Sequence, residues 1–194
     1  HIDGRIEING EIFDAVVLAV APYHVDALLP EDTPDYIQTA YQSLHYHAIT
    51  TVYLRYAQAV KLPAPLTGFA DGTAQWVLHR GALGLPDNEV AVVISVSDCT
   101  EAWKDKDLAE KIHADIKRIC PDLGKPEAVR IITEKRATTE ATVDFVQPDF
   151  SWLHHRRIYP AGDYLHPRYP ATLEAAVQSG FAAAEKLMLD LRFE

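Results

Sequence analysis

The sequence predicts an α/β (α+β) fold in which a mainly antiparallel β region is inserted between two parts of a second domain. Residues 15–20 are apolar on both faces of an extended chain, which is typical of a strand covered on both sides in a parallel sheet. The middle of the chain is rich in β-branched and aromatic residues, which favour strands. The C-terminal segment changes to a short strand and a long helix with one apolar stripe.

A β-hairpin is expected at the start of the chain. Residues 5–8 alternate between polar and apolar side chains. Asn9-Gly10 follows as the strongest two-residue turn signal, because both positions tolerate a positive φ. Residues 11–13 form the returning strand, and two helices are expected further along, over residues 25–29 and 35–47.

The middle region is predicted to contain several strands and one helix. The strands are expected over residues 48–56, 74–79, 89–96 and 128–132, and the second of them belongs to a hairpin over 68–84. Leu108, Ile112, Ile116 and Ile119 recur at helical spacing and predict an amphipathic helix over residues 105–119. Pro121 ends this helix because proline has no backbone N–H to donate.

The last predicted elements are a short strand over residues 157–163 and a long helix that begins around Pro170. The apolar stripe of this helix consists of Leu173, Val177, Gly180, Ala184, Leu187 and Leu191. We therefore expect residues 1–34 and 151–194 to form parts of one α/β domain, with residues 35–150 as the inserted domain.

The composition is that of a globular chain and excludes several classes of protein. Of 194 residues, 48% are hydrophobic and 24% are charged, which argues against disorder. The net charge of −10 is opposite in sign to that of a typical nucleic-acid binder, so no nucleic-acid partner is expected. No apolar run in the sequence reaches the ~20 residues of a membrane-spanning helix. Two cysteines are too few for a disulfide framework and indicate a cytoplasmic protein.

The junction between the last strand and the last helix is the strongest candidate for a ligand site. Gly162 permits close approach to the backbone, and Asp163 places a carboxylate at the carboxyl end of a strand, where open α/β sheets bind ligands. The helix N-terminus adds free N–H groups and the positive end of a dipole. These features suit a ligand with hydroxyl and anionic groups. In the alternative interpretation, Asp163 caps a turn and the helix only packs.

The same junction resembles the C-terminal signature of the FAD-dependent amine oxidase and phytoene desaturase superfamily. In that superfamily a strand ends in Ala-Gly-Asp, and a helix with the pattern Ala-Thr/Ser-Leu/Met-Glu-Gly-Ala-Val-x-Ser-Gly lies under the flavin. This chain departs from the pattern at Ala175, where the superfamily usually has glycine. The resemblance implies FAD as the cofactor, with Asp163 at its ribityl and pyrophosphate region. The implied cofactor-binding residues are Ala161, Gly162, Asp163, Thr172, Leu173 and Glu174.

Residues 16–24, 71–81 and 134–138 resemble the bacterial squalene-associated branch of this superfamily, the hydroxysqualene dehydroxylases. The resemblance implies that residues 1–34 and 151–194 are parts of a Rossmann-like FAD-binding domain and that residues 35–150 bind the substrate. The implied reaction replaces the hydroxyl of hydroxysqualene, a long isoprenoid, by a hydride from reduced FAD. A nicotinamide donor would reduce the flavin.

The superfamily's N-terminal fingerprint, Gly-x-Gly-x-x-Gly, is absent from this sequence, because no two of its glycines are separated by a single residue. The sequence also begins with His1 rather than methionine. We therefore expect roughly the C-terminal half of a longer enzyme, which binds FAD weakly or not at all by itself. Because an isoprenoid partitions into lipid, we also expect peripheral contact with a membrane surface, through an apolar patch or the helix over 35–47.

Candidate substrate-binding and catalytic residues lie in the middle region. Tyr53, Phe69 and Trp76 suit the wall of an apolar chamber, and Gln75, on the opposite strand face from Trp76, completes the substrate-binding set. Ordinary core packing is the alternative for each aromatic residue. The candidates for a group that helps the hydroxyl leave are Arg80 and Glu134.

Other interpretations stay open at this point. The pairs His45-x-His47 and His154-His155 have no carboxylate or cysteine cluster at familiar metal-ligand spacing, so no metal is expected. Within the superfamily, the alternative is a carotenoid or phytoene desaturase, or a flavin amine oxidase. The alternative from a different class is a non-enzymatic binding module.

Overall fold

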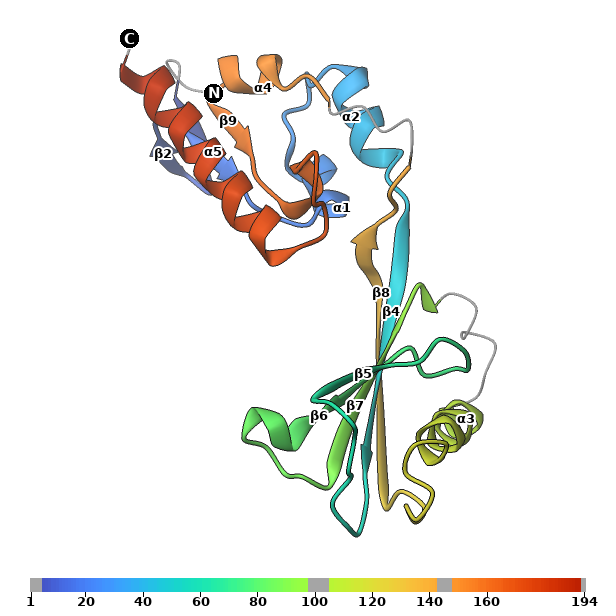
Figure 1. Cartoon of the computed structure of the whole chain (residues 1–194). Helices are drawn as coiled ribbons and strands as arrows, with labels where there is room; N and C mark the ends of the chain where they lie inside the picture. The colour runs from blue at the N-terminus through green and yellow to red at the C-terminus, as the bar shows by residue number, and fades with distance from the viewer. Residues whose placement is uncertain (1–4, 98–104, 143–147, 193–194) are drawn as a thin grey trace. The chain divides into compact units, whose positions relative to one another are not determined.

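The computed structural model describes residues 5–97, 105–142 and 148–192, and the chain divides into two compact units (Figure 1). Unit 1 comprises His1–His45 and Thr139–Glu194, and unit 2 is the intervening segment Tyr46–Thr138. Each unit has its own hydrophobic core. This mixed α/β (α+β) architecture confirms the predicted fold class.

Unit 1 begins with the hairpin that the sequence predicts. β1 (Ile6–Ile8) and β2 (Glu11–Phe13) pair in antiparallel fashion. Asn9 and Gly10 form the turn with φ values of 53° and 84°, in the left-handed region that two-residue hairpin turns require.

The candidate ligand site is positioned by a parallel pair of strands drawn from the two segments of unit 1. β3 (Val16–Leu18) pairs with β9 (Ile158–Pro160), with Val16 opposite Ile158. All three residues of β9 are buried, whereas Val17 of β3 is 40% exposed. The apolar run over residues 15–20 predicts a strand that is covered on both faces. Among the described residues, this strand is covered only in part.

Helices surround this strand pair. They are α1 (Pro22–Val25), the 3₁₀ turn η1 (Asp26–Leu28), α2 (Asp35–Gln42), α4 (Ser151–His155), the 3₁₀ turn η4 (Asp163–Leu165) and α5 (Leu173–Arg192). Their shared core contains Val25, Ile37, Tyr41, Leu153, Ile158 and Tyr164. No helix in the described part of the chain is long and apolar enough to span a bilayer.

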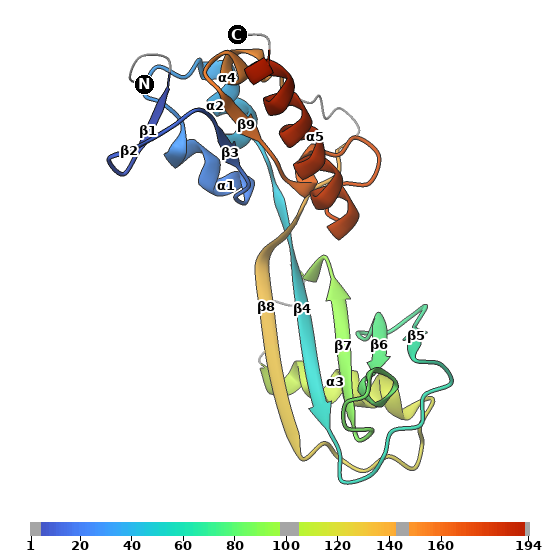
Figure 2. The same ribbon diagram turned by 90° about the vertical axis from the view of Figure 1, so that its left-hand side faces the viewer.

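Unit 2, as far as its residues are described, is a five-stranded sheet with the helix α3 (Asp105–Lys117) on one face (Figure 2). The strand order is β5-β6-β7-β4-β8, and the pairs from β5 to β4 are antiparallel. The strands are β4 (Tyr46–Arg55), β5 (Leu66–Gly68), β6 (Trp76–His79), β7 (Glu89–Ser95) and β8 (Ala128–Thr139). A 3₁₀ turn, η2 (Arg80–Leu83), leads from β6 toward β7.

Several predicted elements have different limits in the structure. The helix expected over 35–47 ends at Gln42, because Tyr46 already belongs to β4. The helix expected from Pro170 begins at Leu173, because Thr172 caps it. The strand expected over 128–132 continues to Thr139 beside β4.

The predicted apolar stripe of α5 is packed only in part, because Leu187 contacts a buried cluster while most of the stripe is exposed. Leu173 and Val177 are 89% and 55% exposed, whereas Ala175 and Ala183 are buried. Ala183 packs with Tyr159 of β9, so the small side chains of α5 form the face that contacts the strand.

The compact units also differ from the predicted domain limits at residues 35 and 150. α2 belongs to unit 1 because Ile37 and Tyr41 are buried in the core of that unit. The aromatic ring of Tyr41 lies against those of Phe150 and Tyr164. The FAD-binding and substrate-binding roles of the predicted domains stay predictions.

Candidate functional site

The carboxyl end of β9 is shaped by a glycine. The strand ladder continues past β9, because the Ala161 N–H donates to the Leu18 carbonyl at 3.0 Å. The next N–H, that of Gly162, donates to Ser179 Oγ on α5 at 3.0 Å. A Cβ on Gly162 would lie 2.2 Å from the Tyr164 ring, so this position requires glycine. The strand end is thereby fixed to both its partner strand and α5.

Asp163 follows at the first position of η4, half-buried at the end of the parallel pair. Its side chain neither caps the turn nor forms a hydrogen bond or ion pair with any residue that the structure describes. The alternative interpretation, in which this carboxylate caps a turn, therefore finds no support. A half-buried carboxylate with free lone pairs can accept hydrogen bonds from ligand hydroxyl groups.

The N-terminus of α5 follows after a short loop. Thr172 Oγ1 accepts the N–H of Ala175 at 3.1 Å and donates to the Tyr169 carbonyl at 2.9 Å, so Thr172 is the N-cap. The preceding residue, Ala171, has a φ of 58°. The N–H groups of Leu173 and Glu174 precede the first intrahelical donors and find no acceptor among the described residues. These two donors lie at the positive end of the α5 dipole.

His166 holds the loop between η4 and α5 in place. Its Nδ1 accepts the N–H groups of Arg168 and Tyr169, at 3.3 and 2.9 Å. Nε2 must then carry the proton, and it donates to Gln178 Oε1 at 2.8 Å. His166 and Ser179 were not predicted as site residues, because the contacts of His166 with Gln178 and of Ser179 with Gly162 form only in the folded chain.

In unit 2, side-chain alternation separates a covered face of the sheet from an open one. Val52 and Leu54 of β4 pack with Ile112 and Ile116 of α3 in the core. The residues that alternate with these core residues along each strand lie on the other face of the sheet, which we call the open face. It carries Tyr53, Trp76, Leu78, Ala91 and Val93, with Trp76 opposite Val93 and both Tyr53 and Leu78 opposite Ala91.

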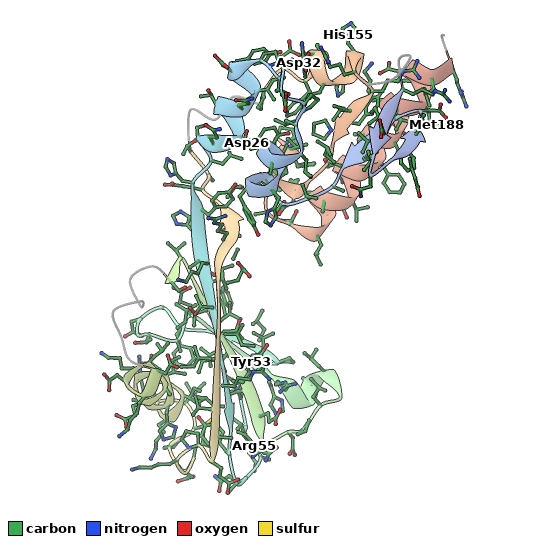
Figure 3. The ribbon with its side chains drawn as sticks, turned by 180° about the vertical axis from the view of Figure 1, so that it is seen from behind. Asp26, Asp32, Tyr53, Arg55, His155 and Met188 are labelled. Carbon is green, nitrogen blue, oxygen red and sulfur yellow. The ribbon has the colours of Figure 1, made fainter. Side chains whose placement is uncertain are left out.

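A charged group borders this apolar surface. The Arg80 guanidinium lies over the Tyr53 ring, 5.4 Å from its centroid, and forms an ion pair with Glu89. Figure 3 labels Tyr53 and Arg55 along the same strand, β4. Of the predicted residues, the structure thus brings Tyr53, Trp76 and Arg80 to one side of the sheet.

The other three predicted residues of unit 2 are placed differently. Phe69 packs against the core cluster that includes α3, so it is not part of the open face. Gln75 exchanges two hydrogen bonds with the Ser95 backbone, at 3.1 and 2.8 Å, and so extends the pairing of β6 with β7. Glu134 is exposed on β8, where its carboxylate accepts the N–H of Arg136 at 3.2 Å.

Comparison with known proteins gives a family match over almost the whole chain. The family model described as "flavin containing amine oxidoreductase" matches residues 3–188. Among curated proteins, the hydroxysqualene dehydroxylase of Rhodopseudomonas palustris is 33% identical over 196 residues, which cover 95% of this chain and 42% of that protein. The enzyme of the same name from Zymomonas mobilis is 28% identical over 182 residues, 89% of this chain and 38% of that protein.

Solved structures show the same fold. A putative protoporphyrinogen oxidase from Exiguobacterium sp. 255-15 aligns with a TM-score of 0.67 at 19% identity, over 99% of this chain and 45% of that chain. A redesigned putrescine oxidase aligns with a TM-score of 0.63 at 13% identity, over 95% of this chain and 45% of that chain. This chain thus spans less than half the length of each of these relatives.

Proposed function

Because the chain belongs to the family of flavin-containing amine oxidoreductases, we propose that it forms part of a FAD-dependent oxidoreductase that acts on a long isoprenoid. The observation that carries the proposal is the corner formed by β9, η4 and α5. It holds the half-buried carboxylate of Asp163 and two N–H groups at a helix N-terminus, and none of these has a partner in the part of the chain that the structure describes.

These groups fit FAD. Asp163 would accept hydrogen bonds from ribityl hydroxyls, and the backbone hydrogen bonds of Ala161 to Leu18 and of Gly162 to Ser179 hold that carboxylate at the end of the strand. The N–H groups of Leu173 and Glu174 would stabilise negative charge on the flavin, and Thr172 fixes the start of this helix as its cap. When bound, reduced FAD supplies the hydride.

The substrate is a long isoprenoid, and hydroxysqualene is the specific candidate. Both curated relatives named above are hydroxysqualene dehydroxylases, and the open face offers the apolar, aromatic wall that such a substrate needs. In this proposal Tyr53 and Trp76 line the chamber and exclude water from an allylic cation. A nicotinamide donor would supply the electrons.

Arg80 and Glu134 are the candidates for assisting departure of the hydroxyl. Arg80 is held by Glu89 and Tyr53, so it offers a fixed cation that can donate hydrogen bonds to the leaving oxygen. Of the two residues, Glu134 is the better candidate for a proton donor, because a protonated carboxyl group can transfer a proton and a guanidinium group cannot.

The test joins this chain to the part of the Rhodopseudomonas palustris relative that lies outside the match. We call the combined protein the complemented protein. With FAD and a reduced nicotinamide, the complemented protein should convert hydroxysqualene to squalene. A Trp76→Leu variant should raise KM roughly tenfold through lost apolar contact. Tyr36→Leu, at a comparably exposed aromatic residue of α2, is the matched control. Dehydrogenation of phytoene without any squalene production would instead identify a desaturase.

A further inference from the structure

A pocket on unit 2 carries an unexpected concentration of positive charge. It has a volume of about 520 Å³ and lies where β4, β7 and β8 meet the turn η2. Its charged lining residues are three arginines, Arg55, Arg80 and Arg130, and one carboxylate, Glu89. This excess contrasts with the net charge of −10 of the whole chain.

Two of the three arginines have no charge partner among the described residues. Arg80 forms an ion pair with Glu89. The side chains of Arg55 and Arg130 form no hydrogen bond or ion pair with any residue in the described part of unit 2 or unit 1. Their guanidinium groups are therefore available to an anion, and their planar donor pairs match the oxygens of a phosphate group.

Apolar surface adjoins these arginines. Tyr53 and Ile132 line the same pocket, and Ile132 is 45% exposed. The turn that brings Arg80 into the pocket also leaves Leu83 and Leu85 68% and 44% exposed. Figure 1 shows this short green turn, η2, on the side of the sheet opposite α3. The pocket thus combines cationic donors with apolar lining side chains, and exposed leucines follow Arg80 in the chain.

We propose that this pocket binds the phosphate group of an anionic amphiphile. Arg55 and Arg130 hold the phosphate, and the apolar chain lies against Ile132. The proposal depends on the proposed function in one respect: that function is the reason to expect isoprenoid molecules at the open face. Phosphate recognition itself requires no flavin.

The experiment measures binding of the 194-residue chain to two phosphate sources. One arm follows sedimentation with vesicles of phosphatidylglycerol in phosphatidylcholine, against vesicles of phosphatidylcholine alone. The other arm follows tryptophan fluorescence during titration with monomeric dihexanoyl phosphatidic acid. The double variant Arg55→Gln/Arg130→Gln should bind roughly 30-fold more weakly in any arm that shows binding.

A matched control removes the same charge elsewhere. Arg5→Gln/Arg192→Gln alters two exposed arginines of unit 1 and should change the affinity less than about threefold. Leu83→Ser should weaken binding to vesicles only. Binding to vesicles would identify a lipid headgroup as the source of the phosphate. Binding of monomeric dihexanoyl phosphatidic acid alone would identify a free amphiphile as the source. Either result supports the proposal that the pocket binds phosphate.

Two results would overturn the proposal. One is the absence of binding in both arms, and the other is an equal loss in the two double variants, which would indicate bulk electrostatics. Circular dichroism of each variant shows that folding is unchanged. If phosphate binds as expected but the complemented protein neither holds flavin nor turns over hydroxysqualene, the proposed function fails and the pocket stands.

Discussion

The ring of Tyr164 occupies the space that a side chain on Gly162 would need. A Cβ at Gly162 would lie 2.2 Å from Cε1 of the ring, and Tyr164 is itself only 4% exposed in the core of unit 1. The shape of the proposed flavin corner is therefore coupled to core packing through these two residues.

Gly162→Ala should lower the free energy of unfolding by about 1–3 kcal/mol, because the buried Tyr164 ring has to move. Gly180→Ala is the matched control, since a Cβ there meets nothing within 4 Å. Gly180 lies within α5, so alanine should stabilise the chain by about 0.5–1 kcal/mol. Urea unfolding measures both values. Equal stability of the two variants would contradict the account of this corner.

Asp115 of α3 fixes the loop before β6. Its Oδ2 accepts the N–H groups of Thr73 and Ala74, at 2.6 and 2.9 Å. Asp115→Ala leaves two backbone donors without an acceptor and should cost about 2–3 kcal/mol, whereas Asp115→Asn keeps an acceptor and should cost less. Asp122→Asn, on the exposed surface, serves as the control. If thermal denaturation shows no difference between Asp115→Ala and Asp115→Asn, these hydrogen bonds do not hold the loop.

The N-cap of α5 depends on one hydroxyl. Thr172→Ala removes the acceptor of the Ala175 N–H and should cost about 1 kcal/mol of stability. Thr172→Ser keeps the hydroxyl and should restore most of this loss. Far-ultraviolet circular dichroism during urea unfolding reports the difference. A serine variant as unstable as the alanine variant would show that the cap is not the cause.

The stability of unit 1 should fall on mild acidification. Burial lowers the pKa of His154 below its ordinary value and Lys186 lowers it further, against the opposing effects of Asp190 and Asp149. Because the unfolded chain then binds a proton more readily than the folded one, stability is complete above the unfolded pKa of about 6.5 and decreases as the pH falls below it.

His154→Gln should therefore reduce the drop in melting temperature between about pH 7.5 and pH 5.5. His24→Gln, at an exposed residue of α1, controls for the loss of a histidine. A pH dependence that is the same in both variants would show that His154 does not contribute to it. The same sign applies to His113 in unit 2, whose pKa is lowered by burial and by Lys117 and Lys125.

Local signals in the sequence predict many of the elements correctly. Asn9-Gly10 alone determines the turn of the first hairpin, because few residues tolerate its backbone angles. Leu108, Ile112 and Ile116 predict α3 because their spacing matches the helical repeat, and all three are buried in the core. These signals act within a few residues and need no knowledge of the rest of the fold.

The remaining features depend on tertiary contacts. Alternation along a strand separates two faces but does not indicate which face a helix covers, so Phe69 and Trp76 look equivalent until α3 is placed. Gln75 is used by the Ser95 backbone, which lies opposite it only after the strands pair. The apolar stripe of α5 is mostly exposed, apart from Leu187, because β9 contacts the alanine face of the helix instead.

The most direct test of the central claim is the visible absorption spectrum of the complemented protein after purification with FAD. The account predicts an oxidised-flavin spectrum, and an affinity for FAD at least about tenfold lower in Asp163→Ala, which loses the carboxylate at the end of β9. Asp149→Ala, at an exposed aspartate before α4, should bind FAD as the unaltered protein does. Undiminished flavin binding by Asp163→Ala, or no flavin in the unaltered protein, would contradict the assignment of this corner to the cofactor.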